Sequence, residues 1–179
     1  MRIEDVLDNI ENFEDAYYER LIDLNLVKSQ QRKCLAMHLG GIIIECRLKQ
    51  LIMKKMKLVK QVSCYWCNAS IISDLRSKEN TFQNLTDVKR HLKSVAVINT
   101  LHNFQDALKL LPEIDVGRPS NIFESVSDPL QRNRESYIAL RYNSDAEFSD
   151  VFFANWYDNF VEARKWIEKR VSVNREVFR

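Results

Sequence analysis

The chain has 179 residues, of which 45% are hydrophobic and 29% are charged, and its formal net charge at pH 7 is +2. This composition excludes a disordered chain, because disorder goes with low hydrophobicity and high net charge. The near-neutral charge gives no global attraction to nucleic acids or membranes. Only three Gly and three Pro are present, which disfavours a sheet-rich fold with many tight turns. We expect one domain over residues 1–179, built from long helices.

Targeting and redox features predict a cytoplasmic protein in the reduced state. No apolar run reaches the roughly 18–20 residues that a membrane-spanning helix needs, so no membrane association is expected. The first residues, Met1–Asp5, carry too many charges for a secretory signal peptide. Four cysteines are too few for a disulfide scaffold of this length.

Two long helices are predicted in the first third of the chain. The first covers about residues 3–26, because apolar residues recur there every three or four positions. The second covers about residues 29–59, with Ser29 as its N-cap, and is apolar nearly all round, as in a central helix. Gly40 and Gly41 in its middle cost about 1 kcal/mol each in helix propensity. We therefore expect another helix to approach closely at this glycine pair.

The middle of the chain leaves alternatives open. Residues 63–76 form either a short helix or a loop, and residues 77–80 are typical of a turn. Helical spacing returns over residues 85–111 and ends at Pro112. This segment is either one bent helix or two helices, the second of them capped by Asn103.

The last third of the chain begins with a segment whose residues are typical of a loop. Residues 112–144 contain all three prolines, and we predict a long ordered loop there, since loops of this length are often functional. The final helix is predicted to start near Ser144 or Asp145 and to end at about Val171. Together the elements predict an all-α fold, an up-and-down helical bundle of four to six helices.

Three segments resemble the HEPN superfamily. Residues 37–52 (MHLGGIIIECRLKQLI) are similar to the second helix of HEPN domains, with its small-residue pair followed by apolar-Glu-small-x-Leu-Lys. Residues 102–108 (HNFQDAL) resemble the family's His-[Asp/Asn]-Leu-x-x-Leu segment. Arg141 and Tyr142, just before the acidic start of the final helix, resemble its closing element. The resemblance covers about residues 5–172.

The resemblance implies a helical bundle that is usually a homodimer, found in toxin–antitoxin, phage-defence and RNA-processing systems. Some HEPN proteins are metal-independent RNases with an Arg-x4–6-His motif near the start of a late helix. Others lack the motif and bind a partner, such as a nucleotidyltransferase. In this sequence no histidine follows Arg118, Arg132, Arg134 or Arg141. We therefore predict a catalytically silent, HEPN-like interaction module, and the alternatives are a metal-independent RNase with a divergent site and a purely structural helical protein.

Four residues are candidates for such a divergent catalytic site. Arg32 and His38 have the spacing Arg-x5-His, although within the second helix. A histidine can act as acid or base near neutral pH, and His102 and Arg141 are the further candidates. The structural alternative is a surface arginine at position 32, a partly buried His38, and a His102 that hydrogen-bonds a loop or a carboxylate.

Glu45 is expected to be a buried carboxylate, because it lies in the most apolar helix. A buried charge is costly unless it is paired. We expect a basic partner on a neighbouring element, with Arg20, His102 and Arg141 as candidates. A structural ion pair or polar network is favoured over a general-base role.

No metal or cofactor site is predicted. Cys64 and Cys67 have the C-x-x-C spacing, but the sequence has no second C-x-x-C and no His-x3–5-His to complete a zinc site. We therefore expect two packed thiols.

One basic stretch is a candidate for nucleic-acid binding. Its lysines could follow a phosphate backbone while a nearby aromatic ring stacks on a base, and the alternative is a solvated helix end. The residues are Lys54, Lys55, Lys57 and Lys60, with Tyr65 and Trp66 beyond them.

Overall fold

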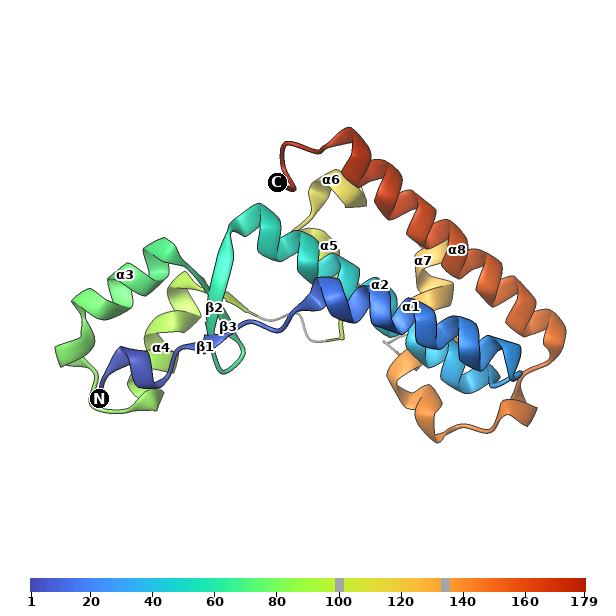
Figure 1. Cartoon of the computed structure of the whole chain (residues 1–179), viewed down its shortest axis with the longest axis horizontal. Helices are drawn as coiled ribbons and strands as arrows, with labels where there is room; N and C mark the ends of the chain where they lie inside the picture. Colours follow the sequence, from blue (N-terminus) through green and yellow to red (C-terminus); the bar gives the residue numbers. More distant parts are fainter. Residues whose placement is uncertain (99–101, 133–135) are drawn as a thin grey trace.

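The computed structural model describes residues 1–98, 102–132 and 136–179. It is an elongated molecule with a larger helical part around α2 and a smaller part at the N-terminal end (Figure 1). The larger part consists of α1 (Phe13–Ser29), α2 (Lys33–Met56), α5 (Phe104–Lys109), α6 (Pro112–Asp115), α7 (Ser120–Ser127), α8 (Asp150–Val173) and the 3-10 helices η3 (Ser136–Tyr142) and η4 (Asp145–Glu147).

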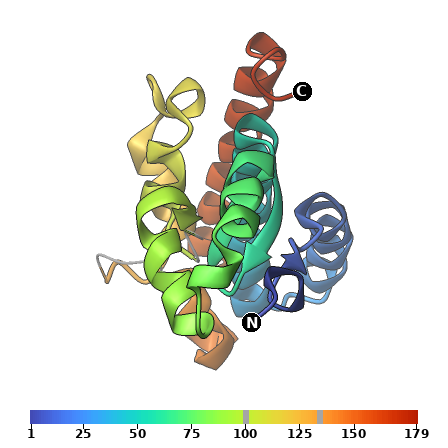
Figure 2. The ribbon, with the colours of Figure 1, turned by 90° about the vertical axis from the view of Figure 1, so that its left-hand side faces the viewer.

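The smaller part combines short strands with two helices. Seen from its own end, α3 and α4 lie in front of the helical bundle (Figure 2). Its elements are η1 (Ile3–Asp5), β1 (Asp8–Asn9), β2 (Leu58–Val62), β3 (Tyr65–Asn68), α3 (Ala69–Ser77), η2 (Glu79–Thr81), α4 (Leu85–Val95) and β4 (Val97–Ile98). They enclose a second hydrophobic cluster, which includes Ile3, Val62, Tyr65, Cys67, Leu75, Val88 and Leu92.

The fold is mostly helical, as predicted, but it is not purely all-α. The strands form an antiparallel sheet in the order β1-β2-β3-β4. Lys57 ends α2 in the left-handed conformation, with φ of 51°, and the chain is extended after it. Val62 pairs with Tyr65, which leaves a two-residue hairpin turn in which Ser63 has φ of 56°. The sequence carries no glycine at either position, so it contained no signal for the hairpin.

The central position of α2 is confirmed. Helices α1, α5, α7, α8 and η3 all pack against it. The prediction for the glycine pair is also confirmed. A Cβ atom at Gly40 would lie 2.5 Å from the ring of Trp156 on α8, and one at Gly41 would overlap the ring of Tyr137 on η3. The predicted N-cap of α2 is wrong, because Ser29 is the last residue of α1 and α2 begins at Lys33 without a side-chain cap of its own. The carboxylate of Asp145 instead accepts a hydrogen bond from the Cys34 amide at 2.7 Å.

The first helix starts later than predicted. Helix α1 begins at Phe13, because the Asn12 side chain caps it by accepting a hydrogen bond from the Asp15 amide at 3.1 Å. The preceding residues belong to the smaller part, where Ile3 is fully buried and Asp8 pairs with β2. The predicted start at residue 3 is therefore wrong.

Of the alternatives for residues 85–111, two helices are correct. Helix α4 ends at Val95, β4 follows, and the Asn103 side chain caps α5 by accepting from the Asp106 amide at 3.0 Å. Residues 63–76, left open between helix and loop, hold all of β3 and most of α3.

The long loop predicted over residues 112–144 is wrong in its local structure. Pro112 takes the first position of α6, where proline is favoured, and α7 and η3 follow. The final helix is confirmed as α8, although it starts at Asp150, with Ser149 as its cap. Ser144 instead caps η4, in a capping box with Glu147. Arg134 lies outside the described residues.

In the part of the chain that the structure describes, no helix combines the length and the apolar character needed to cross a bilayer.

Candidate functional site

The centre of the candidate site is a buried ion pair on α2. Glu45 and Lys49 lie one turn apart, with side chains only 9% and 7% exposed, and the Lys49 Nζ is 2.6 Å from the Glu45 Oε1. A buried ion pair is stable only when further hydrogen bonds complete its geometry. The other groups that contact Glu45 are therefore informative.

Two distant segments supply those further hydrogen bonds. The Tyr137 hydroxyl donates to Glu45 Oε2 at 2.6 Å, and His102 Nδ1 lies 2.7 Å from the same oxygen. We call Glu45, Lys49, His102 and Tyr137 the Glu45 network. The prediction that Glu45 is paired is confirmed, with His102 as the correct one of the three candidates.

The other two candidate partners of Glu45 lie elsewhere. Arg20 forms an ion pair with Asp23 on its own helix, at 2.5 Å. Arg141 is exposed, and its guanidinium lies 4.8 Å from the centre of the Tyr142 ring.

Contact with a carboxylate determines the tautomer of His102. An ionised carboxylate only accepts hydrogen bonds, so Nδ1 of the neutral imidazole carries the proton and Nε2 has the free lone pair. The His102 side chain is 51% exposed, and its Nε2 has no partner among the described residues. This arrangement, a buried carboxylate that orients a solvent-facing imidazole, can accept or donate a proton.

His38 lies on the other side of the same tyrosine. Its Nδ1 donates to the backbone carbonyl oxygen of Tyr137 at 3.0 Å, since a carbonyl oxygen only accepts. The Tyr137 hydroxyl oxygen also lies 3.3 Å from the backbone carbonyl oxygen of His102. The structure thus brings His38, Glu45 and His102 together around one buried tyrosine.

The contacts that Arg32 makes in the structure lie outside this cluster. Its Nε donates to Asp145 at 3.3 Å, and its side chain is 60% exposed. Burial opposes the ionisation of Asp145, but hydrogen bonds from Cys34 and Arg32 outweigh it and hold the pKa of the Asp145 carboxyl below its usual value. Arg32 and Asp145 therefore fasten the start of α2 to the segment before α8.

Comparison with known proteins adds no assignment. No protein-family model matches the chain, and no curated protein or solved structure is significantly similar to it.

The basic stretch is divided among several roles. Lys55 is mostly buried and contacts Glu113 at 2.8 Å and the Leu110 carbonyl at 3.1 Å. Lys54 lies 3.6 Å from Glu14, and Lys60 donates to the Asn9 side chain at 2.7 Å. Lys57 is exposed. The aromatic half of the nucleic-acid hypothesis is wrong, because Tyr65 is 7% exposed and Trp66 is fully buried, so neither ring can stack on a base.

The two cysteines of the C-x-x-C sequence lie on the β2–β3 hairpin. Cys67 is buried, and burial raises the pKa of its thiol to about 11, which keeps it protonated and unreactive. Within residues 1–98, 102–132 and 136–179, no group of three or more His, Cys, Asp or Glu side chains is arranged to hold a metal ion.

Two members of the Glu45 network were not predicted from the sequence. Lys49 could have been found, because it follows Glu45 by four residues and so lies on the same helix face. Tyr137 could not, because nothing near it in the sequence distinguishes it from an ordinary core residue.

Proposed function

We propose that this chain is a HEPN-like interaction module that self-associates and lacks the usual HEPN cleavage motif. The proposal draws on the resemblance of three segments to HEPN domains, which also makes a nucleotidyltransferase-type protein a candidate partner. The observation that carries it is an exposed apolar stripe on α1. Tyr18, Ile22 and Leu26, the α1 stripe, are 56%, 71% and 59% exposed.

The α1 stripe has the spacing of one helix face. Its residues are four positions apart, while Tyr17 and Leu24 on the opposite side are buried in the main hydrophobic core. Grouped exposed apolar side chains mark interaction surfaces more often than single ones do. A surface that pairs with its own copy forms a two-fold symmetric dimer.

Charge on α1 favours a second copy as the occupant. The first turn carries Glu14 and Asp15, and the last turn carries Lys28. Two α1 helices packed in antiparallel orientation therefore place the acidic end of each beside the basic end of the other. This arrangement stabilises the dimer and sets its orientation.

The dimer is tested by Ile22→Arg. We expect the wild-type chain to dimerise and the variant to be monomeric, because a guanidinium at the centre of the stripe would be buried without a partner. The measurement is light scattering coupled to size-exclusion chromatography, over a series of concentrations, because interfaces that bury less than about 1,200 Å² are weak.

The matched control for the dimer is Val151→Arg. Val151 is also 71% exposed, but it lies on α8. This variant should dimerise like the wild type. A wild-type chain that stays monomeric throughout the series, or a dimer that survives Ile22→Arg, would contradict the proposal.

A second candidate function is metal-independent RNA cleavage. The observation that favours it is the pair of imidazoles, His38 and His102, each held through Nδ1 by groups around Tyr137. Two such imidazoles can act as the base for an attacking 2′-hydroxyl and the acid for the leaving oxygen.

Incubation of cellular RNA with the purified protein in EDTA separates the two candidates. The interaction-module proposal expects no cleavage. If RNA is cleaved, His38→Ala and His102→Asn identify the site when both lose activity. His102→Asn places an amide donor where Nδ1 was and removes Nε2. The control, His91→Ala, changes a histidine that pairs with Asp74 in the smaller part.

A further inference from the structure

Helix α4 presents basic side chains on the outside of the smaller part. Its inner side holds Val88 and Leu92, which are fully buried in the second hydrophobic cluster. Lys89, Arg90 and Lys93 lie on its other side, at the three- and four-residue spacing of one helix face. We call these three residues the α4 basic face.

The α4 basic face carries positive charge that the protein does not compensate. The Arg90 guanidinium, in a side chain that is 74% exposed, forms an ion pair with Asp87 at 3.2 Å. Across the described residues, by contrast, the side chains of Lys89 and Lys93 have no ion pair and no hydrogen bond. Lys89 is partly exposed and Lys93 is exposed. Because like charges four residues apart on a helix repel each other, an anion bound between them is favoured.

The element packed beside α4 supplies no free carboxylate to this face. Asp74 on α3 contacts α4 through His91, whose Nε2 lies 2.5 Å from the Asp74 carboxylate. The same carboxylate also pairs with Lys78 at 2.8 Å. Asp74 is therefore already engaged by two basic groups, and the charges of Lys89 and Lys93 remain available to a partner.

A polar hollow adjoins the α4 basic face. It has a volume of about 480 Å³ and lies between α4 and the segment around η2. Arg90 belongs both to the hollow and to the face, and the side chains of Gln83 and His91 are among the other lining groups. Side-chain amides and guanidinium groups bind phosphate and sugar oxygens. The hollow thus extends the basic face with a surface suited to a hydrophilic anion.

The composition of the face distinguishes between the possible anionic partners. Protein–protein interfaces are depleted in lysine and have apolar centres, whereas the exposed apolar residues of α4, Leu85 and Val95, lie only at its two ends. A helix that binds a membrane surface inserts its apolar side, but the apolar side of α4 is buried inside the protein. A nucleic-acid backbone is bound by lysine and arginine without apolar contacts.

We propose that the α4 basic face binds the phosphate backbone of a nucleic acid. Lys89 and Lys93 contact phosphates, and Arg90 directs the backbone towards the adjoining hollow. Such contacts position a nucleic acid without reading its bases. The proposal goes beyond the interaction-module function and involves neither the α1 stripe nor His38 and His102. Failure of dimerisation or of RNA cleavage therefore leaves it intact.

Fluorescence anisotropy of the full-length protein tests the proposal with two labelled probes, a mixed-sequence DNA duplex and a single-stranded RNA. We expect at least one probe to bind at low salt, with an association constant that falls linearly with salt on a double logarithmic scale. Comparison of the two probes distinguishes the backbone of a duplex from that of a single strand.

Paired variants locate the binding surface. Lys89→Glu with Lys93→Glu should weaken binding by about tenfold or more, because it replaces attraction with repulsion. Lys89→Gln with Lys93→Gln should reduce the salt slope by about 2, since each phosphate contact contributes roughly 0.9 on a duplex. The matched control is Lys165→Glu with Lys169→Glu, which reverses two exposed charges at the same spacing on α8. Circular dichroism checks that every variant is folded.

Three results would overturn the proposal. One is that neither probe binds at low salt, including the case in which vesicles of anionic phospholipid bind instead. Another is a loss of affinity in the α8 control as large as that in the α4 variant. The last is a salt slope that stays unchanged when both lysines are replaced by glutamine, since Lys89 and Lys93 would then contact no phosphate.

Discussion

Replacement of Glu45 by leucine is expected to lower the free energy of unfolding by about 3–5 kcal/mol, the usual cost of removing one partner from a buried ion pair. The Lys49 ammonium would stay buried without its carboxylate, since its side chain is only 7% exposed. The Tyr137 hydroxyl and His102 Nδ1 would lose their common acceptor as well. Urea denaturation followed by circular dichroism measures the change.

Two further variants show that the loss comes from the uncompensated charge. The double variant Glu45→Leu with Lys49→Met should be more stable than Glu45→Leu alone, because it replaces both charges with apolar groups. Glu162→Leu removes an acidic residue from an exposed pair with Lys165 and should change stability by less than about 1 kcal/mol. If Glu45→Leu cost no more than Glu162→Leu, the network would not stabilise the fold.

The second large effect is expected at Gly41. Although alanine has the better helix propensity by about 1 kcal/mol, Gly41→Ala should reduce the free energy of unfolding by about 1–3 kcal/mol, the usual cost of overpacking. The new methyl group would overlap the ring and Cβ of Tyr137. That ring cannot easily move, because its hydroxyl and its backbone carbonyl are both hydrogen-bonded.

Chemical denaturation of Gly41→Ala beside Ser172→Ala checks this prediction. Ser172 is an exposed residue of α8, so its replacement changes helix propensity without changing packing. It should leave stability unchanged or slightly higher. A Gly41→Ala variant that is as stable as Ser172→Ala would show that α2 and η3 are not in close contact.

Gly41 and Glu45 act on the same tyrosine. Gly41 makes room for the Tyr137 ring, and Glu45 accepts from its hydroxyl one helical turn further along α2. Both variants therefore disturb the docking of η3 on α2, and their effects should not be additive. His38 and His102 also contact Tyr137, so either replacement is expected to shift the two histidines.

Local patterns in the sequence were sufficient for most of the length of the long helices and for two features of the core. Apolar spacing predicted α2 and α8, because a helix that packs against a core repeats its apolar residues every three or four positions. The glycine pair predicted that another element packs closely against α2. Glycine has poor helix propensity, and the absence of a side chain compensates for this only where it makes room for a neighbour. Glu45 among apolar residues predicted a partner, because a buried charge must be compensated.

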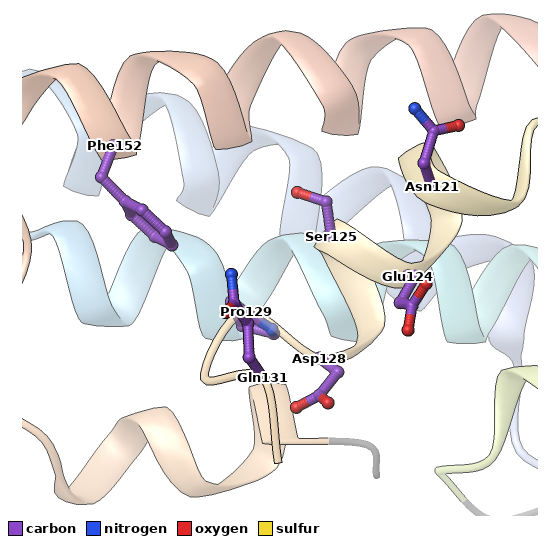
Figure 3. A pocket seen from close by; sticks show the side chains of 7 residues that line it. All are labelled: Asn121, Glu124, Ser125, Asp128, Pro129, Gln131 and Phe152. Carbon is purple, nitrogen blue, oxygen red and sulfur yellow. The ribbon is translucent and has the colours of Figure 1, made fainter. Parts of the chain in front are cut away.

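The tertiary structure alone decided which groups meet at these positions. Tyr137 and His102 are 92 and 57 residues from Glu45 in the sequence, so no local pattern connects them. The β2–β3 hairpin likewise depends on residues far apart, because β1 and β4 complete its sheet. The hollow lined by Asn121, Ser125 and Phe152 (Figure 3) forms where α7 and α8 come together. Helix propensity and apolar spacing act between neighbours in the chain, whereas a site depends on the path that brings distant segments into contact.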